Sequence, residues 1–260
     1  MCFTHGEDCT RCRGRNTLPG VLRNCRGSIA EAVTYGAALA LWQPRLAGQV
    51  DAFVVPSAFA LARLHELRAP VGQAYVLPAV IRQFAPRSAA GDGRHALVVA
   101  RLAPEKGVDI AIEACRIAGM PLVIAGDGPE RERLVAAARA DGADVTFAGR
   151  VDDRELERLR REAIVAIVPS RSGETFGLAA AEAMASGVPV AGSRVGALPE
   201  LIPEEWLAPP GDPRALAEAI RRLRGEAGQA GALAIERVRR VTDPEVVSER
   251  LAQVYAAVDG

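Results

Sequence analysis

The chain has 260 residues, of which 49% are apolar and 25% charged, and its 32 basic side chains balance its 32 acidic ones. This is an ordinary globular composition, and zero net charge gives no electrostatic reason to expect a nucleic acid partner. No apolar run approaches the roughly 20 residues that a membrane helix needs. The first segment, "MCFTHGEDCT", lacks the apolar stretch of a secretory signal. We therefore expect a cytoplasmic protein, either in solution or held at the inner face of the membrane.

The first part of the chain predicts an incomplete α/β domain. The patterns predict helices over 29–42 and 58–67 and strands over 50–57 and 74–78. Because so few strands are present, residues 1–81 are interpreted as part of a Rossmann-like domain. The segment 82–94 is rich in Pro, Gly, Ser and Ala, which favours a linker.

From residue 95 onward, apolar strands alternate regularly with helices. Continuous apolar strands of this kind are typical of a parallel sheet that helices cover on both faces. We therefore predict a complete doubly wound α/β domain over 95–241, and we expect the helix within the final segment 242–260 to pack back toward the N-terminal part. The expected strands are 95–101, 121–126, 145–149, 164–170 and 188–193, and the expected helices are 107–119, 129–141, 153–163, one that begins near Gly177, 213–224, 228–241 and 244–258.

A doubly wound sheet binds its ligands at the carboxyl ends of the strands, where the strand order reverses. The first and fourth strands of this domain should flank that point, which would bring together Arg101, Lys106 and Glu174. A forked guanidinium and a compact ammonium suit a diphosphate, and Lys106 is the only lysine in the chain. Each residue also has a simpler interpretation: Arg101 as a surface arginine, Glu174 as a solvated loop acid, and the single lysine as chance.

The segment "GETFGLAAAEAMASGVPV" at 173–190 places a second carboxylate near an anion-binding position. Gly177 opens a helix whose unbonded N–H groups favour an anion. Glu174 precedes that helix, and Glu182 lies roughly 7 Å further along its axis. Because the helix is mostly small and apolar, we expect Glu182 to be buried, where a carboxylate needs a partner or a function. Two acceptors on either side of a phosphate site match the sugar, diphosphate and ribose of a nucleotide sugar.

Three motifs together resemble a known family. "ARLAPEKG" (100–107), "FAGRV" (147–151) and "VPSRSGETFGLAAAEAMASGVPVAGS" (168–193) are similar to the donor-binding domain of the retaining glycosyltransferases of family 4. Glu174 and Glu182 carry the E-x7-E pattern of that family, and the likeness covers about residues 93–240. The resemblance implies the GT-B fold, with a complete C-terminal domain and a truncated N-terminal one.

The resemblance also implies a role for each matching position. Arg101, Lys106 and Glu174 would be the catalytic set: the two basic residues would bind the diphosphate and stabilise it as the leaving group, and Glu174 would bind the sugar hydroxyls. Glu182 would bind the ribose hydroxyls. Such enzymes retain the anomeric configuration and generally need no metal ion or other cofactor for the transfer. The remaining donor-binding positions would be Arg150 and Val151 near the base, and Thr175, Phe176, Gly177 and Leu178 near the sugar and the distal phosphate.

The N-terminal part departs from the family pattern. The glycine-rich loop that meets the donor phosphates has no counterpart, nor has the histidine near the reacting carbon, for which His5 is a poor substitute. Cys2, Cys9, Cys12 and Cys25 could close a tetrahedral zinc site, but four reduced thiols are the favoured interpretation. The chain is then a truncated gene product, or a half-protein whose partner protein supplies the acceptor domain.

Three functions fit these observations to different degrees. The favoured one is a glycosyltransferase of the hexosyltransferase type, which moves a sugar from a nucleotide-diphosphate sugar to an unidentified glycan, lipid or small-molecule acceptor with retention of configuration. The alternative is a nucleotide-sugar-binding half-protein that is non-catalytic or depends on a partner. A sugar-nucleotide epimerase of the GT-B fold is disfavoured, because the further acids and histidines that it requires are not found here.

Overall fold

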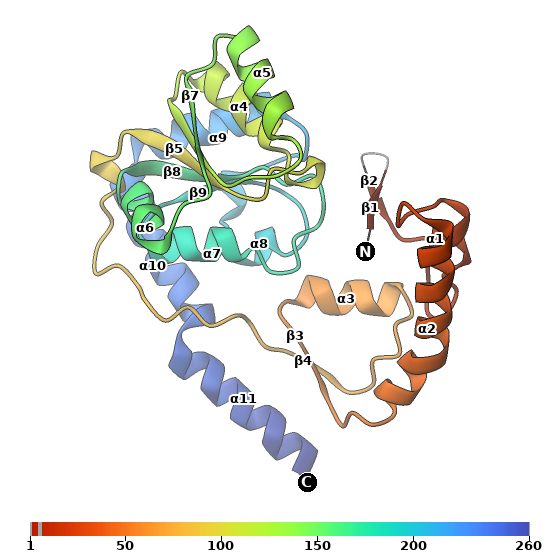
Figure 1. Ribbon diagram of the computed structural model, residues 1–260. Coiled ribbons are helices and arrows are strands. Elements are labelled where there is room, and N and C mark those ends of the chain that lie inside the picture. Colours follow the sequence, from red (N-terminus) through yellow and green to blue (C-terminus); the bar gives the residue numbers. More distant parts are fainter. Residues whose placement is uncertain (1, 5–6, 260) are drawn as a thin grey trace. The chain divides into compact units, whose positions relative to one another are not determined.

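The computed structural model describes residues 2–4 and 7–259, which divide into two compact units (Figure 1). The smaller unit comprises the described residues up to Pro78 and those from Val247 onward, and the larger unit runs from Ala79 to Val246. In the described part of the chain, no helix combines the length and the apolar character needed to cross a membrane.

A six-stranded sheet forms the centre of the larger unit, and every neighbouring pair of its strands is parallel. The strand order is β10-β9-β8-β5-β6-β7, so the chain adds strands first on one side of β5 and then on the other. This arrangement confirms the predicted doubly wound α/β domain. The strands are β5 (His95–Val99), β6 (Leu122–Ala125), β7 (Val145–Gly149), β8 (Ala163–Val168), β9 (Val190–Ser193) and β10 (Leu207–Ala208).

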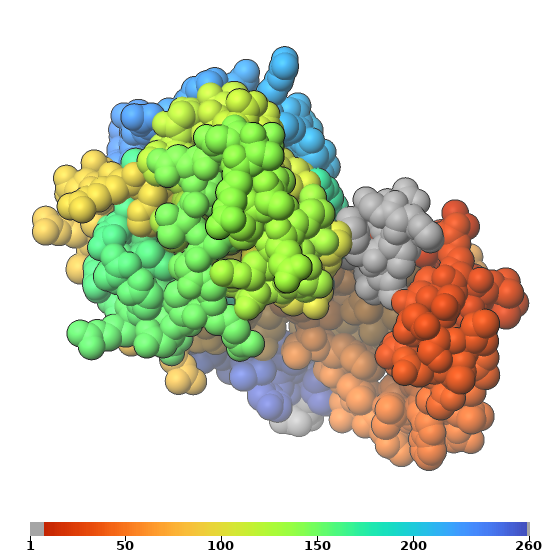
Figure 2. Space-filling model, turned by 45° about the horizontal axis from the view of Figure 1, so that its top comes forward, coloured from red at the N-terminus to blue at the C-terminus, as the bar shows by residue number. Residues whose placement is uncertain are grey.

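Helices cover both faces of this sheet (Figure 1). On one face, α4 (Val108–Ala118) packs against α9 (Pro213–Gly225), and on the other, α7 (Leu178–Ala185) packs against α10 (Ala227–Thr242). The segment that contains α5, β7 and α6, coloured green, covers much of the face of the larger unit shown in Figure 2. The other elements are α5 (Arg131–Ala140), α6 (Asp153–Arg161), α8 (Leu198–Leu201) and the short 3-10 helices η1 (Ala90–Asp92), η2 (Pro104–Lys106) and η3 (Glu204–Trp206).

The core of the larger unit lies between the sheet and these two helical layers. Leu97 of β5 and Ile167 of β8 are fully buried there, as expected for strands that are covered on both faces. On α4, burial raises the pKa of the Cys115 thiol to about 12. His95, at the start of β5, is also buried although its side chain is polar. Burial lowers the pKa of His95, and the nearby charge of Glu162 only partly opposes that shift.

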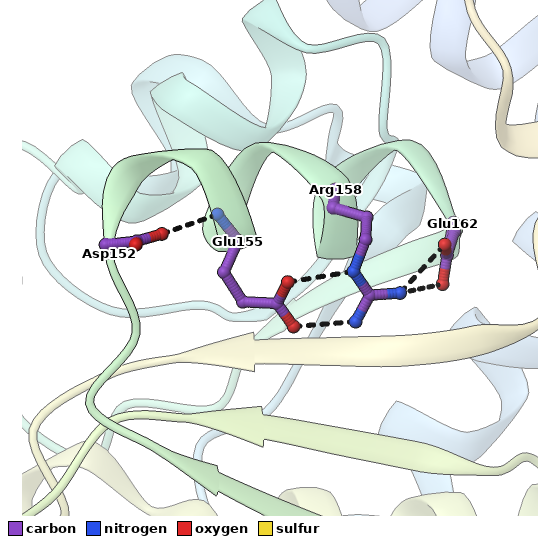
Figure 3. Close-up of polar contacts among 4 residues, drawn as sticks. All are labelled: Asp152, Glu155, Arg158 and Glu162. Atoms are coloured by element: carbon purple, nitrogen blue, oxygen red, sulfur yellow. Dashed lines mark hydrogen bonds and ion pairs between the residues drawn. The ribbon is translucent and has the colours of Figure 1, made fainter.

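Polar contacts fix the start and the exposed face of α6 (Figure 3). Oδ1 of Asp152 accepts a hydrogen bond from the backbone N–H of Glu155 at 2.8 Å, which caps the helix. The guanidinium of Arg158 donates to Glu155 at 2.6 and 2.8 Å and to Glu162 at 2.8 and 2.9 Å. Exposed pairs of this kind add little stability. The cap nevertheless defines where α6 begins, two residues after Val151.

The smaller unit contains a short parallel βαβ motif. Strands β3 (Phe53–Val55) and β4 (Ala74–Val76) pair in parallel and are joined by α3 (Ala58–Glu66). This motif confirms the expected partial Rossmann-like domain. The antiparallel pair β1 (Cys2–Thr4) and β2 (Glu7–Cys9) was not predicted. The remaining helices are α1 (Leu18–Leu22), α2 (Ile29–Ala47) and α11 (Pro244–Asp259), which belongs to this unit from Val247 onward.

The segment 82–94 is part of the larger unit and is bonded to the chain around the end of α7. The backbone N–H of Ala85 donates to the carbonyl oxygen of Ala185 at 2.8 Å, and Oγ of Ser88 donates to the carbonyl oxygen of Gly187 at 2.6 Å. These bonds attach the expected linker to the end of α7. The boundaries 1–81, 82–94, 95–241 and 242–260 stay a prediction.

Candidate functional site

The candidate site lies where the strand order reverses, between β5 and β8. These strands are neighbours in the sheet, as predicted. The chain after β5 passes through η2 into α4, and the chain after β8 leads into α7. Because parallel strands end at the same edge of a sheet, the loops 100–107 and 169–177 emerge together at the edge where doubly wound domains bind ligands.

Lys106 and Glu174 contact each other across these two loops. Nζ of Lys106 donates to Oε1 of Glu174 at 2.7 Å, and Oγ of Ser170 donates to the same oxygen at 2.6 Å. The side chains of Lys106 and Glu174 are 31% and 19% exposed, so the pair is partly shielded from water. Among the described residues, these bonds use one carboxylate oxygen and one ammonium N–H. Oε2 and two further N–H groups therefore remain for a ligand.

The N-terminus of α7 begins shortly after Glu174. Gly177 has a left-handed backbone with φ of 89°, and an added Cβ would lie 2.6 Å from Cδ2 of Leu198, so both conformation and packing require glycine here. Within the described residues, no side chain caps this end of the helix. Its first N–H groups and positive dipole end can therefore meet an anion. Phe176 is buried beside this turn, whereas Thr175 and Leu178 are exposed.

A groove of about 730 Å³ lies at the carboxyl ends of β5, β6 and β7. Three of the predicted donor-binding residues line it together: Arg101, Arg150 and Val151. The mixture of apolar walls with two guanidinium groups and one carboxylate suits a flat polar ligand with an anionic part. The other lining residues are Val99, Ala100, Ala125, Gly126, Asp127, Gly128 and Leu156.

Arg101 is largely exposed and is paired with a neighbour. Its Nη2 donates to Oε1 of Glu105 at 2.7 Å, and its side chain is 67% exposed. Although partial burial alone would raise the pKa of Glu105, the hydrogen bonds to its carboxylate and the nearby charges of Arg101 and Lys106 together outweigh burial, so the pKa lies below the usual range. Exposed pairs are weak, and a diphosphate can compete with Glu105 for this guanidinium.

Glu182 lies on α7 and forms an ion pair with Arg160 of α6. Its side chain is 35% exposed, so it is less buried than the small, apolar helix predicted. Arg160 is only 14% exposed and was not singled out from the sequence. A signal was present, because Arg160 follows Leu156 by one helical turn and so shares its inward face.

A second ion pair that was not predicted joins the loop after β8 to the first turn of α4. The guanidinium of Arg171 binds both carboxylate oxygens of Asp109, at 2.7 and 2.8 Å. The structure therefore brings Lys106 together with Glu174, and Arg101 together with Arg150 and Val151. It gives Glu182 a partner on α6. The donor-binding and catalytic roles of these residues stay predictions.

The cysteines of the first segment form no disulfide among the described residues. Cys9, Cys12 and Cys25 are half-buried thiols, and within the described part of the chain no group of three or more potential ligands is arranged to hold a metal ion. His5 and the side chain of Cys2 lie outside the described residues. The interpretation of all four cysteines as reduced thiols, and not as a zinc site, therefore stays a prediction.

The parallel sheet and the loops at its switch point define a domain of the nucleotide-binding α/β class. The model of the family "Glycosyl transferases group 1" matches residues 81–229, which is more than half of the chain. The chain belongs to this family. The match confirms the resemblance to retaining glycosyltransferases of family 4 and, with the sheet order, the GT-B-like fold.

Three known proteins illustrate the likeness. The chain is 40% identical over 147 residues to the amylovoran biosynthesis glycosyltransferase AmsK of Erwinia amylovora, covering 50% of this chain and 36% of that protein. It is 35% identical over 187 residues to the glycogen synthase of Mycobacterium tuberculosis (strain ATCC 25618 / H37Rv), covering 67% and 45% of the two chains. Sucrose-phosphate synthase from Thermosynechococcus elongatus superposes with a TM-score of 0.69 at 32% identity, covering 80% of this chain and 58% of that one. The chain spans less than half the length of these two curated relatives.

Proposed function

We propose that this chain binds a nucleotide-diphosphate sugar and transfers its sugar, a hexose, to an acceptor with retention of the anomeric configuration. The observation that supports this most is the contact between Lys106 and Glu174 at the switch point, close to the start of α7. A compact cation, a carboxylate and a helix N-terminus in one place suit a diphosphate and the sugar attached to it. The proposal requires no metal ion and no other cofactor for the transfer.

On this proposal, the basic residues stabilise the leaving group. Lys106 and Arg101 bind the diphosphate and offset the negative charge that develops as the bond between the sugar and the phosphate oxygen breaks. That phosphate oxygen then takes the proton of the acceptor hydroxyl, while the acceptor oxygen bonds to the anomeric carbon on the same face. Glu174 accepts hydrogen bonds from the sugar hydroxyls through Oε2.

The nucleoside part of the donor would lie toward the groove at the ends of β5 and β6. Arg150 and Val151 would be near the base, and Glu182 would accept hydrogen bonds from the ribose hydroxyls while its other oxygen keeps Arg160. The backbone from Thr175 to Leu178 would face the sugar and the distal phosphate. The acceptor would be a glycan, a lipid or a small molecule, and not a nucleic acid.

A second candidate function is a donor-binding half-protein that needs a partner protein for catalysis. The observation that favours it is the described part of the smaller unit, whose parallel sheet has only two strands. Sheets of this kind are stable when further strands or helices cover them. A partner that supplies an acceptor domain would meet that need.

Calorimetric titration with nucleoside diphosphates tests the donor site that both candidates share. Uridine, guanosine and deoxythymidine diphosphates are compared with the corresponding nucleosides, in wild type and in Lys106→Ala. We expect one diphosphate to bind, and we expect Lys106→Ala to weaken it by roughly 10- to 100-fold, as for a lost charged hydrogen bond, with nucleoside binding nearly unchanged. Lys106→Arg is the matched variant, because it keeps the charge. Equal losses for diphosphate and nucleoside would contradict the phosphate role of Lys106.

A transfer assay separates the two candidates. Wild type is incubated with the sugar nucleotide of the diphosphate that binds, and release of the free nucleotide is measured with and without a mixture of simple sugar and lipid acceptors. Turnover supports the transferase. Tight donor binding without turnover supports the half-protein, and no donor binding contradicts both.

A further inference from the structure

Two charged residues outside the predicted donor-binding set join the loops that carry Lys106 and Glu174. Arg171 lies in the loop after β8, and Asp109 lies in the first turn of α4. Nη1 of Arg171 donates to Oδ1 of Asp109 at 2.7 Å, and Nη2 donates to Oδ2 at 2.8 Å. Two parallel bonds of this kind fix both the distance and the orientation of the groups that they join.

Arg171 also binds the backbone of the opposite loop. The backbone N–H of Arg171 donates to the carbonyl oxygen of Glu105 at 2.9 Å, and Nη1 of its guanidinium donates to the carbonyl oxygen of Pro104 at 3.3 Å. These bonds attach the chain on one side of Lys106, and the carboxylate of Asp109 attaches it on the other. Arg171 therefore holds the segment that carries Lys106 from both sides.

The pair is partly shielded from water, unlike most ion pairs among the described residues. Arg171 is 30% exposed and Asp109 is 33% exposed. Although burial alone would raise the pKa of Asp109, the guanidinium of Arg171 lowers it below its usual range. Both groups are therefore charged at neutral pH. Neither residue is among those that line the groove at the ends of β5, β6 and β7.

We propose that Arg171 and Asp109 are positioning residues that set the spacing between Lys106 and Glu174. This inference rests on the proposed function, because the spacing matters when these two residues bind the diphosphate and the sugar of one donor. The stem of a lysine is flexible, so the ammonium acquires a defined place only when its backbone is held. A misplacement of about 1 Å in such a group can cost about a hundredfold in rate.

The test compares wild type with Arg171→Lys, Asp109→Asn and the double variant by titration with uridine, guanosine and deoxythymidine diphosphates. Arg171→Lys keeps the charge but removes the fork. We expect each single variant to bind the diphosphate roughly 5- to 30-fold more weakly, with nucleoside binding unchanged. All three variants remove the same ion pair. The double variant should therefore bind the diphosphate no more weakly than the single variant with the larger loss.

Glu113 and Arg116 provide a matched control on the same helix. Arg116 also binds both carboxylate oxygens of Glu113, through Nε at 2.7 Å and Nη2 at 2.8 Å, nearer the other end of α4. The control variants Arg116→Lys and Glu113→Gln are expected to bind the diphosphate as wild type does. A loss in the controls equal to the loss in Arg171→Lys would overturn the inference.

Amide hydrogen exchange of the protein without nucleotide separates this inference from the proposed function. We expect the amides of 101–107 and 170–176 to exchange at least several-fold faster in Arg171→Lys than in wild type, and the control Arg116→Lys to match wild type. If wild type binds a diphosphate but Arg171→Lys binds it equally tightly, or both loops exchange at the wild-type rate, the inference is overturned while the proposed function stands. If wild type binds no diphosphate, the proposed function fails and the positioning role fails with it.

Discussion

Replacing Gly107 with alanine is expected to destabilise the larger unit and to disturb the candidate site at the same time. Gly107 follows Lys106 and has a left-handed backbone with φ of 62°. An added Cβ would lie 2.2 Å from the carbonyl oxygen of Pro169, so the loop or the end of β8 has to move by about 0.8 Å to reach 3.0 Å, below which real Cβ contacts essentially never fall. We expect a loss of about 1–2 kcal/mol from the left-handed conformation and about 1–3 kcal/mol more from the displaced backbone.

Gly119 shows the first contribution alone, so comparison with it isolates the second. It lies at the other end of α4 with nearly the same backbone, φ of 61°, but an added Cβ there would meet nothing within 4 Å. Gly119→Ala should therefore cost only the conformational part, about 1–2 kcal/mol. The difference between the two variants measures the close approach of the chain after Lys106 to the end of β8.

Tryptophan fluorescence during urea unfolding measures this difference. Trp206 is 2% exposed in the larger unit, whereas Trp42 is 60% exposed in the smaller unit. The chain has two tryptophans, so a Trp42→Phe background leaves Trp206 as the reporter of the larger unit. Equal losses for Gly107→Ala and Gly119→Ala would refute the steric reasoning. Unchanged diphosphate binding by folded Gly107→Ala would refute the link between this contact and the position of Lys106.

Three further predictions concern single side chains. Glu182→Ala should weaken nucleoside binding by about 1–3 kcal/mol, measured by titration calorimetry, and an unchanged dissociation constant would remove Glu182 from the site. Burial lowers the pKa of His95, so as the pH falls His95 takes up a proton in the unfolded chain at a higher pH than in the folded one. The contribution of neutral His95 to stability against urea should therefore be complete above about pH 6.5 and be lost as the pH drops below that value. His95→Gln should flatten this decline. Because burial raises the pKa of Cys115 to about 12, its thiol should resist iodoacetamide at pH 8 in the native protein while Cys9 reacts, as peptide mass mapping can show.

The order of strands and helices could be predicted because each main strand is a continuous apolar run between turn residues. Residues 95–99 and 163–168 carry this pattern, and the winding rule for parallel sheets then made β5 and β8 neighbours. The two-residue strand β10 was missed because it is too short to show a period. Its pairing with β9, which joins Leu207 to Gly192, depends on tertiary contact.

The partners of the charged residues were harder to predict. Arg171 and Asp109 are 62 positions apart, and no local spacing connects them. Glu182 was expected to be buried because its helix is made of small residues, yet small neighbours leave room for α6 to supply Arg160 instead of excluding water fully. The sequence pattern of one helix predicts which of its faces is apolar. It does not predict which charged side chain another element places against that helix.

The pairing of both candidate carboxylates with basic residues decides which variants are informative. A partly shielded carboxylate that loses its cationic partner is still desolvated but no longer compensated. Truncating the partner therefore changes the measured free energy by more than the loss of one contact. Lys106→Ala removes the proposed phosphate ligand and also leaves Glu174 with Ser170 as its remaining partner among the described residues. Lys106→Arg keeps the charge balance and changes the geometry alone. The difference between wild type and Lys106→Arg is therefore the best measure of what the compact ammonium itself contributes to diphosphate binding.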